Sequence, residues 1–267
     1  MKRSGLAAVF AASALLPRLY APPPLITGDV PTADKGNFEL YTGFRYQDTG
    51  RIQRQLPHVE LVYGLAERWE ISADGNYLSR AGAHGLDDVT IATKAVFVEE
   101  SATSPAIGVS YEFKFDSGNA ARGLGSGGNE HDLRLRAQKS FGQITPILNA
   151  GYVLVPDVSI AGRTSARQDV WRASLAPEWQ ASKRVKLLVE IYWRTADEPG
   201  GAATLGWNVG FKQKLRDGVT SHGAIGESLR PGNRGGPDLR AYVGVKFEFA
   251  APWHHAITRR NRSPARK

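Results

Sequence analysis

The chain has 267 residues, a length that suits one large all-β domain or two domains of ordinary size. It contains no cysteine, which excludes disulfide bonds and thiolate metal sites, and no apolar run reaches the ~20 residues that a spanning helix needs. The formal net charge of +8 resides in the two ends, because residues 22–249 hold 26 basic and 26 acidic residues. A neutral body gives no sign of a nucleic-acid partner.

Residues 1–21 have the pattern of an export signal peptide. Lys2 and Arg3 precede the apolar run GLAAVFAASALLP, and a small residue at Ala21 fits a cleavage site. The alternative is a helix at the N-terminus of the mature protein. Residues 22–37 are punctuated by proline and glycine and show no periodicity, so we expect an extended lead-in.

The clearest structural unit is residues 55–77, which contain two alternating segments joined by a short turn. Leu61 and Tyr63 alternate with Glu60 and Gly64, and the alternation restarts at Trp69. Successive side chains of a strand point to opposite faces, so the pattern predicts a β-hairpin with one apolar and one polar face.

Similar alternation continues to residue 249, and no segment has a helical period of comparable length. The predicted strands lie at about 38–47, 55–65, 69–77, 88–97, 107–115, 133–141, 144–152, 171–179, 185–193, 205–212, 219–228 and 239–249. Alternation is weakest in the eleventh of these. Short connections follow the second, sixth, eighth and tenth strands, and most of the others are long.

Aromatic residues gather at both ends of these strands on the apolar face. One group lies beside short turns or the C-terminal end: Trp69, Phe97, Phe141, Trp179, Phe211, Phe247 and Phe249. The other group lies beside long loops: Phe44, Tyr46, Tyr77, Phe115, Tyr152, Trp171 and Trp193. Two aromatic girdles around an aliphatic band are typical of outer-membrane barrels.

We therefore predict an all-β fold, an antiparallel transmembrane β-barrel of about 12 strands over residues 38–249. Short turns would face the periplasm and longer loops the outside. The alternative is a soluble barrel or sandwich, which would turn its apolar face inward around a core.

Three features of the sequence resemble sites of chemistry. The run Gly123–Gly128 matches the G-x-G-x-x-G pattern, but a strand follows it where a dinucleotide loop requires a helix, so we interpret it as an outer-loop turn. His58 with Glu60, and His222 with Ser221, lack the partners of a hydrolytic triad or a three-ligand metal site. We expect no enzyme activity, no cofactor and no metal.

Residues 250–267 read as a basic, disordered tail, with binding to anionic lipid or a periplasmic partner as the alternative.

Several short motifs spread over half of the chain carry a family resemblance. They are Pro24-Leu-Ile-Thr with Asp29, Thr32 and Lys35-Gly36; Tyr63-Gly64-Leu65 with Arg68; Gly85-Leu86-Asp87-Asp88 with Lys94; Gly123–Gly128; and Gln138-Lys139-Ser140-Phe141-Gly142. Together they resemble the outer-membrane transporters named for the meta-pathway of phenol degradation. The resemblance implies an exported β-barrel that passes aromatic or other small hydrophobic compounds. This chain departs from the family at Asp116-Ser117-Gly118-Asn119, where members carry Pro-Thr-Gly-Asp.

The combined pattern predicts an outer-membrane channel for the passive uptake of small solutes, in contact with outer-membrane lipid and lipopolysaccharide. The alternative is a non-conducting barrel with a structural, adhesive or lipid-modifying role, in which the lead-in plugs the lumen. Inward-facing glycines such as Gly108, Gly206 and Gly244 are expected to leave space in the lumen.

Inward-facing bases outnumber acids in the half of the predicted barrel nearest the long loops, so we expect a weak preference for anions. The residues predicted to line the lumen and set its selectivity are Arg45, Arg54, Asp74, Asp88, Glu112, Lys114, Arg134, Arg136, Arg172, Glu190, Arg194 and Arg240. Arg134 and Arg136 are the leading candidates, and the alternative is that they bind lipopolysaccharide phosphates or pair with Glu112 and its neighbours.

Overall fold

The computed structural model describes residues 24–49, 52–80, 82–160, 162–229 and 236–251. The predicted export signal and the tail beyond Ala251 lie outside these residues. The strands are β1 (Asn37–Asp48), β2 (Ile52–Ala66), β3 (Trp69–Arg80), β4 (Ala83–Leu86), β5 (Thr90–Val98), β6 (Ala106–Lys114), β7 (Glu130–Gln138), β8 (Ile144–Leu154), β9 (Val158–Ile160), β10 (Arg163–Ser165), β11 (Val170–Gln180), β12 (Val185–Arg194), β13 (Thr204–Arg216), β14 (Val219–Ser228) and β15 (Leu239–Ala250). A short 3-10 turn, η1 (Ala120–Arg122), lies between β6 and β7. Within the described ranges, no helix is long and apolar enough to cross a bilayer.

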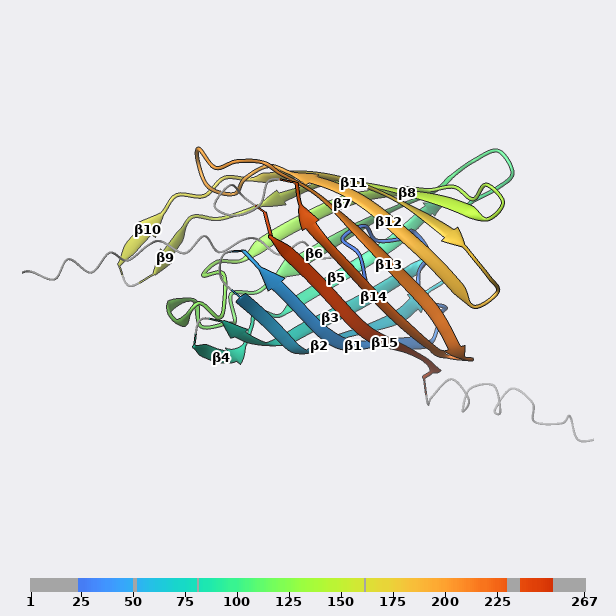
Figure 1. The fold of residues 1–267 in the computed structure, drawn as a ribbon, viewed down its shortest axis with the longest axis horizontal. Helices are drawn as coiled ribbons and strands as arrows, with labels where there is room; N and C mark the ends of the chain where they lie inside the picture. Colours follow the sequence, from blue (N-terminus) through green and yellow to red (C-terminus); the bar gives the residue numbers. More distant parts are fainter. Residues whose placement is uncertain (1–23, 50–51, 81, 161, 230–235, 252–267) are drawn as a thin grey trace, which may run out of the picture.

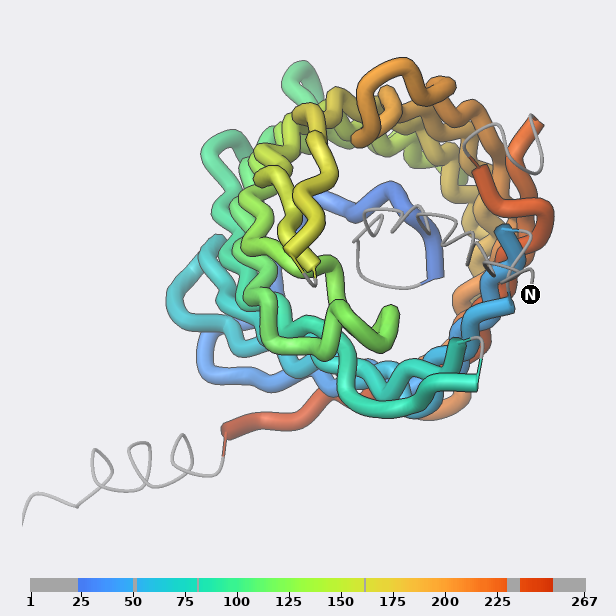
Figure 2. Tube along the Cα trace, turned by 90° about the vertical axis from the view of Figure 1, so that its left-hand side faces the viewer, coloured from blue at the N-terminus to red at the C-terminus, as the bar shows by residue number. Residues whose placement is uncertain are grey.

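Twelve of these strands close into one antiparallel barrel (Figures 1 and 2). Strands that follow one another in the barrel pair in sequence, and β1 pairs with both β2 and β15, so that Phe38 lies opposite Phe249. β4 pairs with the outer part of β3, and β9 with β10 forms a hairpin in the loop between β8 and β11. The predicted twelve-stranded barrel is confirmed.

The two ends of the barrel differ. The short turns β2–β3, β7–β8, β11–β12 and β13–β14 lie at one end, where β1 begins and β15 ends, and the long loops lie at the other (Figure 1). We call these the inner and outer ends, because short turns face the periplasm in barrels of this kind.

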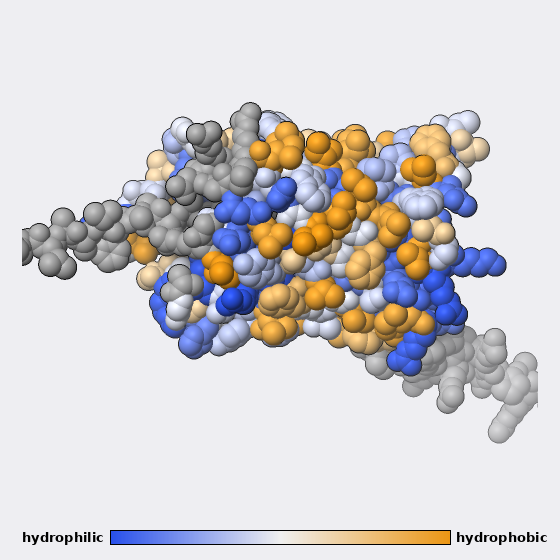
Figure 3. Space-filling view, viewed as in Figure 1, coloured by the Kyte–Doolittle hydropathy of each residue, from blue (hydrophilic) through white to orange (hydrophobic). Residues whose placement is uncertain are grey.

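The barrel is apolar on its outside and polar in its lumen, the reverse of a soluble protein. Leu135, Val189 and Val243 point outward and are 51%, 54% and 55% exposed, whereas the inward-facing Arg134 and Glu190 are 2% and 0% exposed. Apolar side chains spread across the middle of the face in Figure 3, and polar ones gather toward both ends. Such an exterior is stable against lipid tails rather than water.

One predicted lumen residue lies on the opposite face of its strand. β2 pairs regularly with β3 on both sides of Leu56 and Pro57, but the register shifts between Gln55 and His58. One extra residue in a strand moves the side chains beyond it to the other face. Arg54 is therefore exposed on the outside, and Gln55 points into the lumen. The assignment of Arg54 to the lumen was wrong, because it continued the alternation through the bulge.

Inward-facing glycines make room for neighbouring side chains. The Tyr242 ring crosses Gly43 and Gly244, and the Tyr192 ring crosses Gly206, so closely that a β-carbon at these glycines would collide with the hydroxyl oxygens. Here the space that the glycines leave is filled by tyrosine rather than left open.

The inside-out pattern predicts a depth-dependent cost of charge on the exterior. Val189→Arg, near the middle of β12, should lower the free energy of unfolding by about 2–4 kcal/mol, because it places a charge at the bilayer midplane. Leu154→Arg, at the outer end of β8, should cost about 0–1 kcal/mol. The measurement is urea unfolding in lipid vesicles. Equal costs at the two positions would show that this exterior does not face a bilayer.

Candidate functional site

The lead-in, residues 24–35, lies inside the barrel (Figure 2). It enters at the inner end, where the Gly36 amide donates to the Gly64 carbonyl at 2.8 Å and the Ala251 amide donates to the Gly36 carbonyl at 2.9 Å. From there it follows the lumen wall from β3 to β12, as its contacts with Glu70 on β3 and Glu190 on β12 show. A segment with no periodicity in the sequence therefore occupies the interior of the fold.

Glu190 holds the far end of the lead-in. Its carboxylate accepts hydrogen bonds from the Ile26 amide at 2.9 Å, from the Thr27 hydroxyl at 2.6 Å and from the Thr27 amide. The Asn208 side-chain amide on β13 donates to the same carboxylate. Hydrogen bonds to a charged acceptor contribute about 1.5–3 kcal/mol each. Alternation places Glu190 in the lumen, but only the structure shows that it binds backbone of the lead-in.

Further side chains bind the middle of the lead-in. Asn149 on β8 both donates to the Gly28 carbonyl and accepts from the Gly28 amide, each at 2.9 Å. Arg136 on β7 donates to the Asp29 carbonyl at 3.2 Å. The amides of the lead-in thus find partners that a neighbouring strand would otherwise supply.

The Asp29 side chain is the one acidic group of the lead-in's central part. It lies 3.8 Å from the Lys94 ammonium and 3.7 Å from the Lys212 ammonium. Enclosure in the lumen raises the pKa of Asp29, but the charges of Lys212, Lys94 and Arg136 lower it more, so its pKa lies below the ordinary value. The carboxylate is therefore ionised at neutral pH and attracts both lysines.

The predicted outer ring of arginines forms an ion-pair network. Arg134 lies 3.3 Å from Glu112 and 3.1 Å from Asp132, and Arg136 lies 3.7 Å from Glu112. Arg172 also pairs with Asp132. Arg134 and Arg136, the leading candidates for setting selectivity, thus have the alternative arrangement, in which they pair with Glu112 and its neighbours. Asp132 stands near the start of β7, one residue before the strand that the sequence predicts at 133–141.

Asp88 anchors the glycine-rich outer loop. Its carboxylate accepts from the Gly118 amide at 2.9 Å and from the amide and hydroxyl of Ser126, both at 2.7 Å. Lys114 lies 4.0 Å from Asp88 and pairs with Glu130. The run Gly123–Gly128 is thus a loop wrapped around a carboxylate, which agrees with its interpretation as an outer-loop turn.

The remaining predicted residues also point inward. Arg194 pairs with Asp197 at 3.1 Å. Asp74 lies 3.1 Å from the Nδ1 atom of His58. Arg45 donates to the Gln55 side chain at 3.2 Å and lies over the Tyr242 ring. Arg240 is 7% exposed and, like Arg45, lies outside ion-pair distance of any carboxylate of the described residues. Eleven of the twelve predicted lumen residues therefore face the interior, and Arg54 does not.

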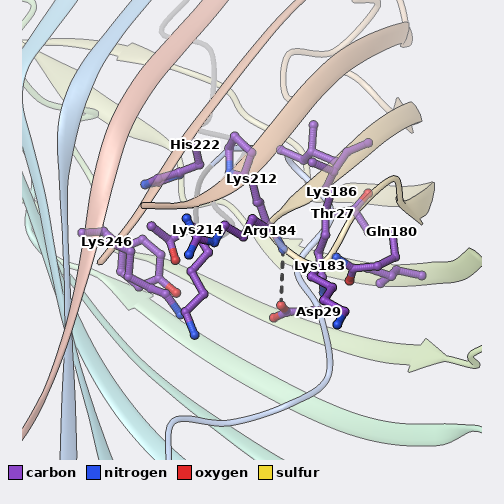
Figure 4. Close-up of a pocket in the computed structure, with 17 residues that line it drawn as sticks. Thr27, Asp29, Gln180, Lys183, Arg184, Lys186, Lys212, Lys214, His222 and Lys246 are labelled. Atoms are coloured by element: carbon purple, nitrogen blue, oxygen red, sulfur yellow. Dashed lines mark ion pairs between the residues drawn. The ribbon is translucent and has the colours of Figure 1, made fainter. Parts of the chain in front are cut away.

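A cavity of about 320 Å³, here called the inner vestibule, opens between the lead-in and the inner ends of β11–β15 (Figure 4). Pro24, Leu25 and Asp29 of the lead-in form one side of it. Six cations line it: Lys183, Arg184, Lys186, Lys212, Lys214 and Lys246. A count of inward-facing strand positions misses two of these cations, because Lys183 and Arg184 stand in the turn between β11 and β12.

Comparison with known proteins identifies the fold. No family model matches the sequence, and no curated protein sequence matches it. The COG4313 outer membrane channel from Pseudomonas putida F1 is similar in structure, with a TM-score of 0.70 and 14% identity over 85% of this chain and 100% of that chain. The NanC porin has a TM-score of 0.57 with 11% identity over 79% of this chain and 98% of that one, and the KdgM porin 0.54 with 11% over 78% and 99%. The fold is that of the outer-membrane β-barrels.

The contacts of Glu190 predict that its removal loosens the lead-in. Glu190→Ala should raise amide hydrogen exchange at residues 25–28 at least about tenfold, because one charge-assisted hydrogen bond contributes about 1.5–3 kcal/mol and 1.4 kcal/mol corresponds to a factor of ten. Glu130→Ala is the matched control, a buried lumen carboxylate that pairs with Lys114 instead. Unchanged exchange in Glu190→Ala, or an equal rise in the control, would contradict the assigned role.

Proposed function

We propose that this protein is a passive channel of the bacterial outer membrane for small solutes. The observation that carries the proposal is the inner vestibule, a polar cavity of about 320 Å³ beside the lead-in within a barrel that has an apolar exterior. Charged side chains in a barrel interior cost desolvation free energy, so a barrel that serves only as a scaffold gains nothing from lining a cavity with them. A solute pathway accounts for the polar interior and the apolar exterior together.

For the solute, we propose small organic compounds, including aromatic ones. The motifs behind the family resemblance support this, because two of them form hydrogen-bonded parts of the lumen. These are the lead-in near Asp29 and the loop around Asp88. The structurally similar KdgM porin has been solved in complex with disordered oligogalacturonate, an acidic oligosaccharide, which agrees with passage of anions through a barrel of this kind. Contact with lipid and lipopolysaccharide at the outer rim belongs to the same proposal.

Conductance tests the channel directly. Purified full-length protein in a planar bilayer should give discrete conductance steps, and deletion of residues 24–33 should enlarge them, because the lead-in occupies part of the lumen. Glu130→Ala, which leaves the lead-in contacts in place, serves as the control for a general loosening of the barrel. Absence of steps in both the wild type and the deletion variant would favour a non-conducting structural, adhesive or lipid-modifying barrel.

Selectivity is a separate expectation. We propose that Arg45 and Arg240, which lie outside ion-pair distance of the carboxylates among the described residues, give the outer lumen a positive field that favours anions. In a salt gradient, the wild-type reversal potential should indicate weak anion selectivity, and Arg45→Gln/Arg240→Gln should move it toward cations. Arg122→Gln/Arg163→Gln removes the same charge from the outer loops and should move it less. A cation-selective wild type would contradict this part of the proposal.

A further inference from the structure

We infer that the inner vestibule is a binding site for a small organic carboxylate with an apolar body. This inference deepens the proposed function, on which its biological meaning rests. A volume of about 320 Å³ lies at the lower end of the range, about 300–1,000 Å³, that ligand pockets occupy. The chemical class follows from the charge, the apolar wall and one unsatisfied polar group.

The charge is positive where a ligand would enter. Lys183 and Arg184 in the β11–β12 turn are exposed, and neither lies within ion-pair distance of a carboxylate among the described residues. Lys186 and Lys212 share Glu178, at 2.5 and 3.1 Å, and Lys212 also lies 3.7 Å from Asp29. Lys214 pairs with Asp217, and Lys246 with Glu39 and Glu248. Exposed cations at the entrance attract anions, and an arginine presents a planar set of donors that matches a carboxylate.

The cavity also has an apolar wall. Pro24 and Leu25 of the lead-in line it together with Ile147, Leu188 and Tyr41 of the barrel, and Leu25 packs against Leu188. This mixture suits a ligand with one charged end and an apolar body, because most ligand pockets combine apolar walls with a few placed polar groups. An inorganic anion such as phosphate would leave the apolar wall without a partner.

His222 gives an independent indication of a ligand. The side chain is 2% exposed and points into the vestibule from β14 (Figure 4). Neither ring nitrogen is hydrogen-bonded to another side chain of the described residues, although the ring lies edge-on to Tyr41 at a centroid distance of 5.8 Å. Buried polar groups in native proteins usually have partners. A backbone hydrogen bond with Val245 serves one ring nitrogen, and a carboxylate or a water that accompanies it would supply a partner for the other.

Benzoate is the probe for this site, with benzamide as its uncharged counterpart and inorganic phosphate as the anion without an apolar body. Titration calorimetry on detergent-solubilised full-length protein should show saturable benzoate binding, with benzamide and phosphate at least tenfold weaker. Lys183→Ala/Arg184→Ala should weaken benzoate binding at least tenfold. These exposed turn residues can be replaced without loss of the fold, because the turn's hydrogen bond from the Lys214 amide uses the Arg184 carbonyl.

The matched control is Arg122→Ala/Arg163→Ala, which removes two exposed cations from the outer loops and should change benzoate affinity less than twofold. Equal binding of benzamide, equal binding of phosphate, or an equal effect of the control would overturn the inference. Benzoate binding without conductance would refute the proposed channel and leave the site standing. Conductance without benzoate binding would refute the site and leave the proposed channel standing.

Discussion

The lead-in is a stretch of backbone inside a barrel, and its position depends on lumen side chains that replace the hydrogen bonds of a sheet. A buried amide without a partner costs about 1–3 kcal/mol. Side chains on four different strands each accept a hydrogen bond from a backbone amide of the lead-in: Glu190, Asn149, Gln138 and Glu70. The lead-in is therefore fixed by one half of the barrel wall as a whole. This arrangement leaves part of the lumen, the inner vestibule, unfilled.

The charges of the outer lumen are largely used to hold strands together. Arg134, Glu112 and Asp132 lie on the neighbouring strands β6 and β7, and Arg172 reaches Asp132 across the Gly151 position of β8. Removing one partner of a buried pair typically costs about 3–5 kcal/mol, because it leaves the other charge uncompensated. Arginines of this kind chiefly hold the wall of the lumen together.

The sequence was sufficient to predict the barrel, because each strand carries its own alternation and its own aromatic ends. The same method failed at Arg54, since alternation cannot register the extra residue in β2 that only pairing with β3 reveals. It also gave no path for the lead-in, whose contacts with Glu190 and Asn149 join residues more than a hundred positions apart. Counts of charge along the predicted strands could not tell which arginines form ion pairs. Two of the pairing acids escape such a count, because Asp132 lies at the end of a strand and Asp197 lies in a loop.

The inner vestibule and the lead-in share a cation, which links them thermodynamically. Lys212 lies between Glu178 and Asp29, so an anion bound in the vestibule competes with Asp29 for the same ammonium group. Binding of the anion would then weaken one attachment of the lead-in. By reciprocity, the Asp29–Lys212 contact weakens the binding of an anion at Lys212 by the same factor. The lead-in would therefore set the affinity of the vestibule in two opposed ways, through the apolar wall of Pro24 and Leu25 and through the carboxylate of Asp29.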